Sequence, residues 1–430
     1  MEMNFRDNLL EFLNKEQADA LINSFKKEDH HAVILNPRKM SDELFLSLFP
    51  NVKKHPYVSH AYIFDKNEYQ LGKTLWHELG CFYIQEPSAM IVSSLINVKE
   101  NDLVLDMCAA PGGKSIGLSF KMNQKGLIIS NDLSRSRANL LVENSERLGL
   151  ENLLITNNDF EKIYKKYLDK FDVIILDAPC SGSGMFRKDD KMIDNWSINK
   201  IYKYAEIQKN LIDIAYKMLK PGGILSYSTC SYSVEEDEEV IESLLRNTDA
   251  EIIEIKGIPD AYINPHNPIG IRLLPSLFKG EGQYICQIRK PGIKKETTFD
   301  NLINSNFSLP LVCKNKSIVK YGQTYFCLSN ITKLYDLNIV RYGIKIGEES
   351  KGIFRYDLHF ARSLRKDDFD SVELSEKEIK DYLEGNVIYK ENPFKGYVLL
   401  TYLSIPIDIA KSDTHQIKNY YPKGLRKKVI

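Results

Sequence analysis

The sequence predicts an α/β protein whose core is a mostly parallel sheet with helices on both faces. From about residue 98 to 290, apolar runs of strand length alternate with amphipathic stretches, of which 135–150 is the clearest helix. The apolar runs are nearly continuous, as in strands buried on both faces, and parallel strands need helical crossovers between them. Five such runs are predicted strands: 102–107, 126–131, 153–156, 171–176 and 223–228.

Other patterns flank this core. Residues 1–88 mix helical spacing (Leu9, Leu10, Leu13) with short strand-like pieces, which predicts a small α+β module. Beyond a linker-like segment at 290–295, short aromatic-rich runs broken by Gly and charge predict small mixed domains. We therefore expect four domains, at 1–88, 89–290, 300–365 and 366–430.

Composition places the chain among soluble proteins. It has 430 residues, 43% hydrophobic and 27% charged, and lacks a run of the roughly 18 apolar residues that a membrane helix needs. Seven cysteines without framework spacing fit a reducing cytoplasm. The formal net charge of zero does not by itself favour nucleic-acid binding. Basic residues cluster at 289–295 and 418–428, where they fit a solvated surface as well as an RNA contact.

The turn after the first predicted strand has the features of a nucleotide site. Asp106 is followed by a small-residue run that leads into a helix: Cys108, Ala109, Ala110, Pro111, Gly112, Gly113 and Lys114. Such a turn lets a ligand approach the backbone and the positive end of the helix. Asp132 ends the next strand, where it suits a ribose diol, and Asp159 follows the third strand. An ATPase phosphate loop is a competing interpretation of Gly113-Lys114-Ser115, but Cys108 stands where that motif needs glycine.

Two cysteines follow the fourth and fifth predicted strands. Cys180 lies in Asp177-Ala-Pro-Cys180 and Cys230 in Ser-Thr-Cys230-Ser, so both are expected at the cofactor's edge of the sheet. Methylation of cytosine at carbon 5 would give both thiols a role. One thiolate adds to carbon 6, which makes carbon 5 a nucleophile, and a second thiol can assist release of the enzyme from the methylated base. Asp177 could stabilise charge at ring nitrogen 3. Spacing alone does not decide which thiol attacks, and no cluster has metal-site spacing, so no metal is predicted.

These motifs closely resemble those of the Sun-type RNA cytosine-5 methyltransferases. The matching segments are Cys108-Ala-Ala-Pro-Gly-Gly-Lys114, Asp177-Ala-Pro-Cys-Ser-Gly182 and Ser228-Thr-Cys-Ser231. The resemblance implies a seven-stranded Rossmann-like core that binds S-adenosylmethionine at 108–114, with Asp132 at the ribose, Asp159 at the adenine and Asp177 beside the methyl donor. It also implies Cys230 as the nucleophile and Cys180 as the group that aids release. DNA cytosine methyltransferases would instead use the position of Cys180.

Segments outside the core resemble the bacterial RsmF/YebU group. They are 80–90, 341–347 and 419–425. This resemblance implies RNA binding by the N-terminal module and by a PUA-like domain at 366–430. It also implies 16S ribosomal RNA, or the small ribosomal subunit, as the partner, and no membrane. Two alternatives stay open: the same chemistry on tRNA, and a non-catalytic RNA-binding or ribosome assembly factor.

Overall fold

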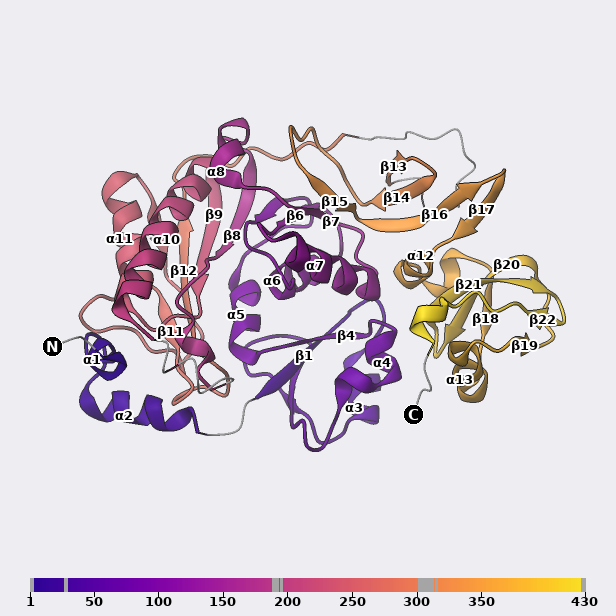
Figure 1. Cartoon of the computed structure of the whole chain (residues 1–430), viewed down its shortest axis with the longest axis horizontal. Coiled ribbons are helices and arrows are strands. Elements are labelled where there is room, and N and C mark those ends of the chain that lie inside the picture. Colours follow the sequence, from indigo (N-terminus) through magenta and orange to yellow (C-terminus); the bar gives the residue numbers. More distant parts are fainter. Residues whose placement is uncertain are drawn as a thin grey trace.

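The computed structural model describes residues 4–26, 30–187, 193, 196–300, 313 and 316–426. Its strands form four sheets (Figure 1), and the largest is the predicted α/β core. In the described residues no helix is both long and apolar enough to cross a membrane. Nor does this part of the chain hold a group of three or more side chains suited to a metal ion.

The core sheet has the strand order β10-β12-β9-β8-β5-β6-β7-β15, with β11 paired to β12. All five predicted strands are present and parallel: β5 (Leu103–Asp106), β6 (Leu127–Asn131), β7 (Leu153–Thr156), β8 (Phe171–Asp177) and β9 (Leu219–Thr229). Antiparallel β12 (Gln283–Arg289) and then β10 (Glu251–Ile253) complete the seven expected strands. The sequence analysis missed two more, β11 (Ile271–Leu273) and β15 (Ile339–Tyr342), which raise the count to nine.

Helices cover both faces of this sheet, because successive residues of each buried strand point to opposite sides. Leu103 and Leu105 share a buried cluster with α8 (Phe160–Ile163), α10 (Ile198–Met218) and α11 (Glu238–Asn247). Val104 between them packs toward α6 (Gly113–Lys121) and α7 (Arg135–Leu148). The expected α7 ends at Gly149, whose φ of +72° suits a residue without a Cβ. α5 (Pro87–Leu95) packs against β11 and β12.

The N-terminal 88 residues separate into two parts. Helices α1 (Phe5–Leu9) and α2 (Lys15–Ser24) pack on the α/β core, where Leu9 shares a buried cluster with Phe186 and Tyr232. The second part is a sheet of order β2-β3-β1-β4 below the core in Figure 1. Its elements are β1 (His31–Leu35), α3 (Asp42–Leu48), β2 (Lys53–Lys54), β3 (Ala61–Phe64), α4 (Leu75–Glu78) and β4 (Phe82–Gln85).

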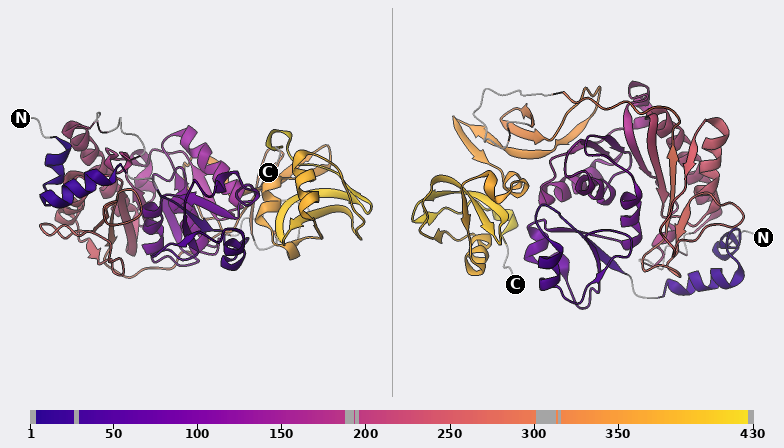
Figure 2. Two further views of the ribbon diagram at one scale, coloured as in Figure 1. Left: turned by 90° about the horizontal axis from the view of Figure 1, so that it is seen from below. Right: turned by 180° about the vertical axis from the view of Figure 1, so that it is seen from behind.

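The C-terminal extension begins by joining the core. Within it β13 (Ser317–Tyr321), β14 (Thr324–Leu328), β16 (Ile344–Ser350) and β17 (Ile353–Tyr356) form one sheet. β15 lies between β14 and β16 in sequence but pairs instead with β7 of the core. The edge of the core sheet at β7 is therefore not left open to solvent. After α12 (Leu358–Ser363), the last sheet lies at the end of the molecule (Figure 2). Its strands are β18 (Ser371–Glu373), β19 (Ile388–Tyr389), β20 (Lys395–Tyr402), β21 (Ile405–Asp413) and β22 (Gln416–Ile417). Helix α13 (Glu376–Glu384) lies between β18 and β19 in the sequence.

The basic residues at 289–295 hold the linker-like segment against the core. The Lys290 ammonium lies 2.7 Å from Asp169, and that of Lys294 lies 2.7 Å from Asp102. In the C-terminal cluster, Arg426 donates to the carbonyl of Tyr421, while residues 427 and 428 lie outside the described part. The domain boundaries at 88, 290 and 365 stay predictions. The pairing of β15 with β7 crosses position 290, and one buried cluster holds residues from both sides of positions 88 and 365.

Candidate active site

A cavity of about 680 Å³ lies at the carboxyl ends of the parallel strands. It is lined by the turns that follow β5, β6, β7, β8 and β9 and by one side of α10. The predicted site residues that line it are Cys108, Asp132, Asp159, Asp177, Cys180 and Cys230. The edge where parallel strands end is where α/β sheets bind ligands, and the structure brings these six predicted residues together there.

The two thiols meet in this cavity. Asp177 of β8 lies opposite Ser228 of β9, so the residues that follow each strand continue side by side. The Sγ atoms of Cys180 and Cys230 are 3.0 Å apart, and both side chains are partly exposed. The hydrogen bond to Cys230, together with burial, raises the pKa of Cys180 well above its ordinary value. Cys180 is therefore the partner that keeps its proton.

Asp177 stands beside the thiols and is surrounded by donors. The Lys114 ammonium is 2.7 Å from its Oδ2, while the Ser228 hydroxyl (2.7 Å) and the Gln283 amide (3.3 Å) donate to its Oδ1. Burial lowers the pKa of Lys114, but Asp177, Asp106 and Cys230 together outweigh this effect, so the net pKa is raised. This ion pair at the edge of the cavity was not predicted from the sequence.

Two further carboxylates border the cavity, and each also shapes its own turn. Asp132 accepts from the backbone of Ser134 through Oδ1 at 2.9 Å. Its Oδ2 is buried without a hydrogen-bond partner in the described structure, with an Arg137 nitrogen 3.5 Å away. Asp159 caps α8 through the amide of Glu161 and pairs with Lys162 at 3.0 Å. A buried oxygen left with acceptor capacity is what a ligand hydroxyl would satisfy.

The small-residue turn at 108–114 borders the cavity at its first residue and then leads into α6. Cys108 lines it, whereas residues 109–114 lead away into α6 and lie outside the lining. Gly112 has φ +116°, and a Cβ there would collide with Leu141. Behind the turn, burial raises the pKa of Asp106 to about 7 although Ser115 donates to its Oδ2 at 2.7 Å. A cavity with a tight glycine turn and a carboxylate at the next strand end fits a nucleoside cofactor.

Sequence reasoning also missed the side of the cavity that α10 supplies. Tyr204, Ile207 and Leu211 line it and are spaced three and four residues apart. That spacing places them on one helical face, so the signal was present in the sequence. The long stretch around α10 has many apolar positions, however, and only the packing shows which of them face the cavity.

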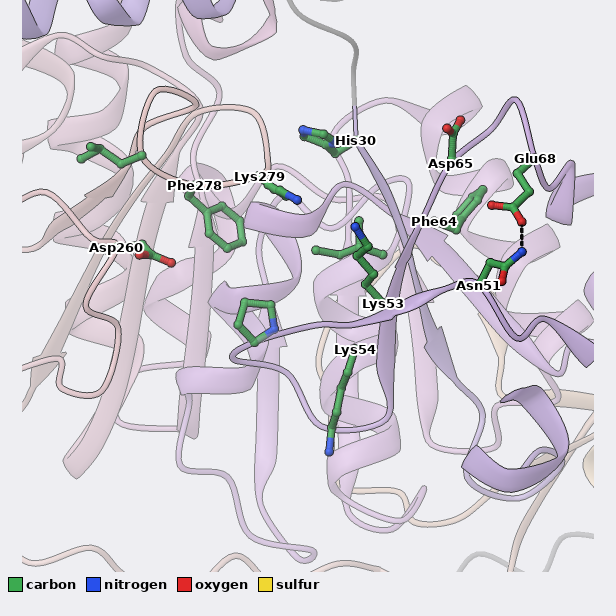
Figure 3. Close-up of a pocket in the computed structure, with 13 residues that line it drawn as sticks. His30, Asn51, Lys53, Lys54, Phe64, Asp65, Glu68, Asp260, Phe278 and Lys279 are labelled. Carbon is green, nitrogen blue, oxygen red and sulfur yellow. Dashed lines mark hydrogen bonds between the residues drawn. The ribbon is translucent and has the colours of Figure 1, made fainter. Parts of the chain in front are cut away.

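A second hollow of about 590 Å³ lies between the N-terminal sheet and the 260–279 loop (Figure 3). Its lysines are Lys53, Lys54 and Lys279, and its carboxylates are Asp65, Glu68 and Asp260. Asn51 donates to Glu68, and the Tyr57 hydroxyl donates to Asp260. Because the charges balance, electrostatics does not indicate an anion or a cation, and the two-thiol cavity is the candidate active site.

Comparison with protein families identifies the chain. Residues 93–289 match the family described as 16S rRNA methyltransferase RsmB/F. Residues 1–87 match the N-terminal domain of 16S rRNA methyltransferase RsmF, and residues 369–427 match the methyltransferase RsmF PUA domain. The chain belongs to the RsmB/F family. It is therefore an S-adenosylmethionine-dependent RNA methyltransferase of the RsmF type, as its motifs predicted.

Relatives match over most of the chain. Ribosomal RNA small subunit methyltransferase F of Shewanella woodyi is 31% identical over 456 residues, covering 96% of this chain and 94% of the relative. The protein of that name from Vibrio vulnificus strain YJ016 is 30% identical over 390 residues, covering 84% and 82%.

Solved structures share the fold. A methyltransferase homolog from Pyrococcus horikoshii is 29% identical with a TM-score of 0.57, covering 66% of this chain and 98% of its own. NSun6 from Pyrococcus horikoshii with SFG is 22% identical with a TM-score of 0.62, covering 67% and 98%. The predicted Rossmann-like core is confirmed, and the matched PUA domain confirms the predicted C-terminal extension.

Proposed function

We propose that this enzyme methylates carbon 5 of cytosine in RNA of the small ribosomal subunit, through a covalent bond between Cys230 and the base. The observation that carries the proposal is the pair of thiols 3.0 Å apart in the cofactor cavity. A methyltransferase acting on a nucleophilic nitrogen or oxygen needs no thiol, whereas carbon 5 of cytosine must first be activated.

In the proposed reaction, the Cys230 thiolate adds to carbon 6 of the cytosine and makes carbon 5 nucleophilic. S-adenosylmethionine, when bound, supplies the methyl group that carbon 5 takes. The proton on carbon 5 then leaves to a base, and the electron pair of that bond re-forms the ring double bond as the sulfur–carbon bond breaks. Cys180 retains its proton because of its hydrogen bond to Cys230 and its burial, which suits a group that assists release rather than attack.

The remaining cavity residues have proposed binding roles. Asp177, held by Lys114, is placed to protonate or hydrogen-bond ring nitrogen 3 of the cytosine, which takes up the negative charge that thiolate addition brings to the ring. Asp132 offers its free oxygen to the cofactor ribose, and Asp159 lies where it can contact the adenine. Of the turn, Cys108 would contact the cofactor, while Ala109 to Gly113 would position it through the backbone. The target base must be unpaired or flipped out of its stack to reach the thiols.

The covalent step is tested by trapping protein–RNA adducts with three variants. Cys180→Ala should accumulate an adduct that survives denaturing electrophoresis, because release is slowed. Cys230→Ala should form none and should not methylate. Cys286→Ala is the matched control, since Cys286 is buried on β12 away from the cavity and should behave as wild type. Methylation by the Cys230→Ala protein would refute the nucleophile assignment.

The RNA target is proposed from the relatives' names and from the matched PUA domain. Bisulfite sequencing of total RNA from a deletion strain should show loss of methylation at one or a few small-subunit sites. Restoration by wild type but not by Cys230→Ala would tie that loss to catalysis. Loss confined to tRNA would contradict the ribosomal target. Full complementation of a growth defect by Cys230→Ala would instead indicate a non-catalytic assembly role.

A further inference from the structure

A buried glutamate connects the two loops that carry the thiols. Glu236 ends the short helix η4 (Val234–Glu236) and has no exposed surface. Its Oε1 accepts from the backbone of Ser181 (2.8 Å) and from Gln208 (3.0 Å). Its Oε2 accepts from the hydroxyls of Ser181 (2.5 Å) and Ser231 (2.6 Å). One carboxylate thus receives four hydrogen bonds.

The positions of these donors are informative. Ser181 directly follows Cys180 and Ser231 directly follows Cys230, so Glu236 binds each loop one residue from its sulfur. Gln208 of α10 adds a second tie to the first loop, because its amide also donates to the carbonyl of Pro179 at 2.9 Å. A buried carboxylate is costly unless its oxygens are bonded, and here the bonds also fix two flexible turns to each other.

We propose that Glu236 is a positioning residue that holds the Cys180 and Cys230 loops at the separation that two-thiol catalysis requires. This inference rests on the proposed function, because only a reaction that uses both sulfurs on one base needs their separation fixed. Glu236 does not line the cavity and touches no reacting atom, so its effect is carried by the two serines. It also adds to the raised pKa of Cys180, after the Cys230 hydrogen bond and burial.

Reach and charge can be separated with two variants. Glu236→Asp keeps the charge but shortens the side chain by one carbon, so it cannot bond both loops in their present positions. Glu236→Gln keeps the length, and its amide can accept from the Ser181 backbone while donating to the two hydroxyls. If position is what matters, Glu236→Asp is the damaging change. The control is Glu235→Gln, since the neighbouring Glu235 bonds Asn8 at the N-terminal helix rather than a thiol loop.

In kinetics, Glu236→Asp should lower kcat by about 10- to 100-fold, as small misplacements of reacting groups do, with little change in KM for cofactor and RNA. It should also accumulate covalent adduct, because Cys180 is displaced from the base. Glu236→Gln and Glu235→Gln should stay near wild type. A larger loss in Glu236→Gln than in Glu236→Asp, or a wild-type Glu236→Asp, would overturn the proposal. Should Glu236→Asp fail to fold, Ser231→Ala removes only the Cys230 arm and should lower kcat with little change in KM, and a wild-type kcat would overturn the proposal.

A second measurement does not depend on methylation. Phenylarsine oxide condenses with two adjacent thiols, forming two arsenic–sulfur bonds and releasing water, and peptide mass mapping locates the bridged pair. The Cys180–Cys230 bridge should form readily in wild type and Glu236→Gln, and about tenfold less in Glu236→Asp. Equal bridging in all three would refute positioning even if the chemistry holds. Methylation by Cys230→Ala would refute the proposed covalent mechanism. The bridging result would still show whether Glu236 fixes the distance between the two thiols.

Discussion

The active-site cavity differs from the region where the domains meet, which we call the α7 junction. The junction comprises Glu78, Glu146, Arg341, Arg362 and Tyr421, which gather at the C-terminal end of α7. Arg362 lies 3.1 Å from Glu78, the Tyr421 hydroxyl donates to Glu78 at 3.0 Å, and Arg341 lies 2.7 Å from Glu146. These residues come from the N-terminal sheet, the core and the C-terminal extension (Figure 1).

The two regions differ in what their polar groups contact. In the cavity, Asp132 keeps a buried oxygen without a hydrogen-bond partner among the described residues. In the junction, oppositely charged groups meet each other, so the contact joins domains rather than binding a ligand. The difference teaches that an ion pair points to function when one of its members also lines a cavity, as Asp177 does.

The junction also explains the resemblance outside the core. Gly80 packs so closely on α7 that a Cβ would collide with the carbonyl of Arg147. Gly343, beside Arg341, donates to the carbonyl of Leu153 at 2.9 Å. Asn419 in the last segment donates to the carbonyl of Tyr382 at 2.6 Å. All three segments that resemble the RsmF/YebU group therefore hold domains together or shape their ends.

The largest expected effect is in the cavity. Asp177→Asn should lower kcat by about 10²- to 10⁴-fold, the range for a group that assists proton transfer or stabilises charge. Single-turnover methylation of a short RNA measures it. Asp213→Asn, at an exposed ion pair with Lys217, is the control and should retain full activity. A variant of Asp177 with normal kcat would remove this residue from the reaction.

A substitution in the α7 junction should lower the stability of the protein rather than its activity. Arg362→Met removes the buried guanidinium that pairs with Glu78 and should lower the free energy of unfolding by about 2–3 kcal/mol, with kcat unchanged below the transition. Urea unfolding and activity at low temperature measure the two quantities. Arg246→Met, at an exposed pair with Glu242, should cost at most about 0.5 kcal/mol. A loss of kcat without a loss of stability would show that the contrast between the regions is wrong.

A smaller effect should separate the two cofactor carboxylates. Asp132→Asn should weaken S-adenosylmethionine binding about tenfold, equal to about 1.4 kcal/mol, because a buried acceptor is lost. Asp159→Asn should weaken it less, since Asp159 already caps α8 and pairs with Lys162. Isothermal titration of cofactor measures both. The reverse order would mean that the cofactor lies closer to Asp159 than proposed.

A last effect is a pH dependence from a buried lysine near the junction, Lys39, which lies against the end of α4. Burial lowers the pKa of Lys39 to about 7, and its ammonium donates to the carbonyl of Leu79 at 2.8 Å. Between pH 7 and the ordinary lysine pKa the unfolded chain binds more protons, so stability should rise with pH. Wild type should gain roughly 1–2 kcal/mol from pH 7 to 9, and Lys39→Met should lose that gain. Lys125→Met, an exposed lysine, should keep it; equal slopes for both variants would exclude Lys39 as the source.

Much of the core could be predicted from sequence. The five buried strands, helix α7 and the strand-end positions of Asp132, Cys180 and Cys230 follow from local patterns. β15 could not be predicted, because a four-residue strand that pairs with β7 across almost 190 residues has no local signal. The separation of α1 and α2 from the N-terminal sheet depends likewise on packing against distant Phe186 and Tyr232.

The sequence by itself determined the α/β core and the order of the functional motifs, because strand periodicity and turn chemistry are local properties. The family followed from the resemblance of those motifs to known ones. Only the tertiary structure decided that Lys114 pairs with Asp177, that Glu236 joins the two thiol loops and that the domains meet at the end of α7. These contacts join residues distant in the chain, and their geometry depends on how strands and helices pack rather than on any spacing in the sequence.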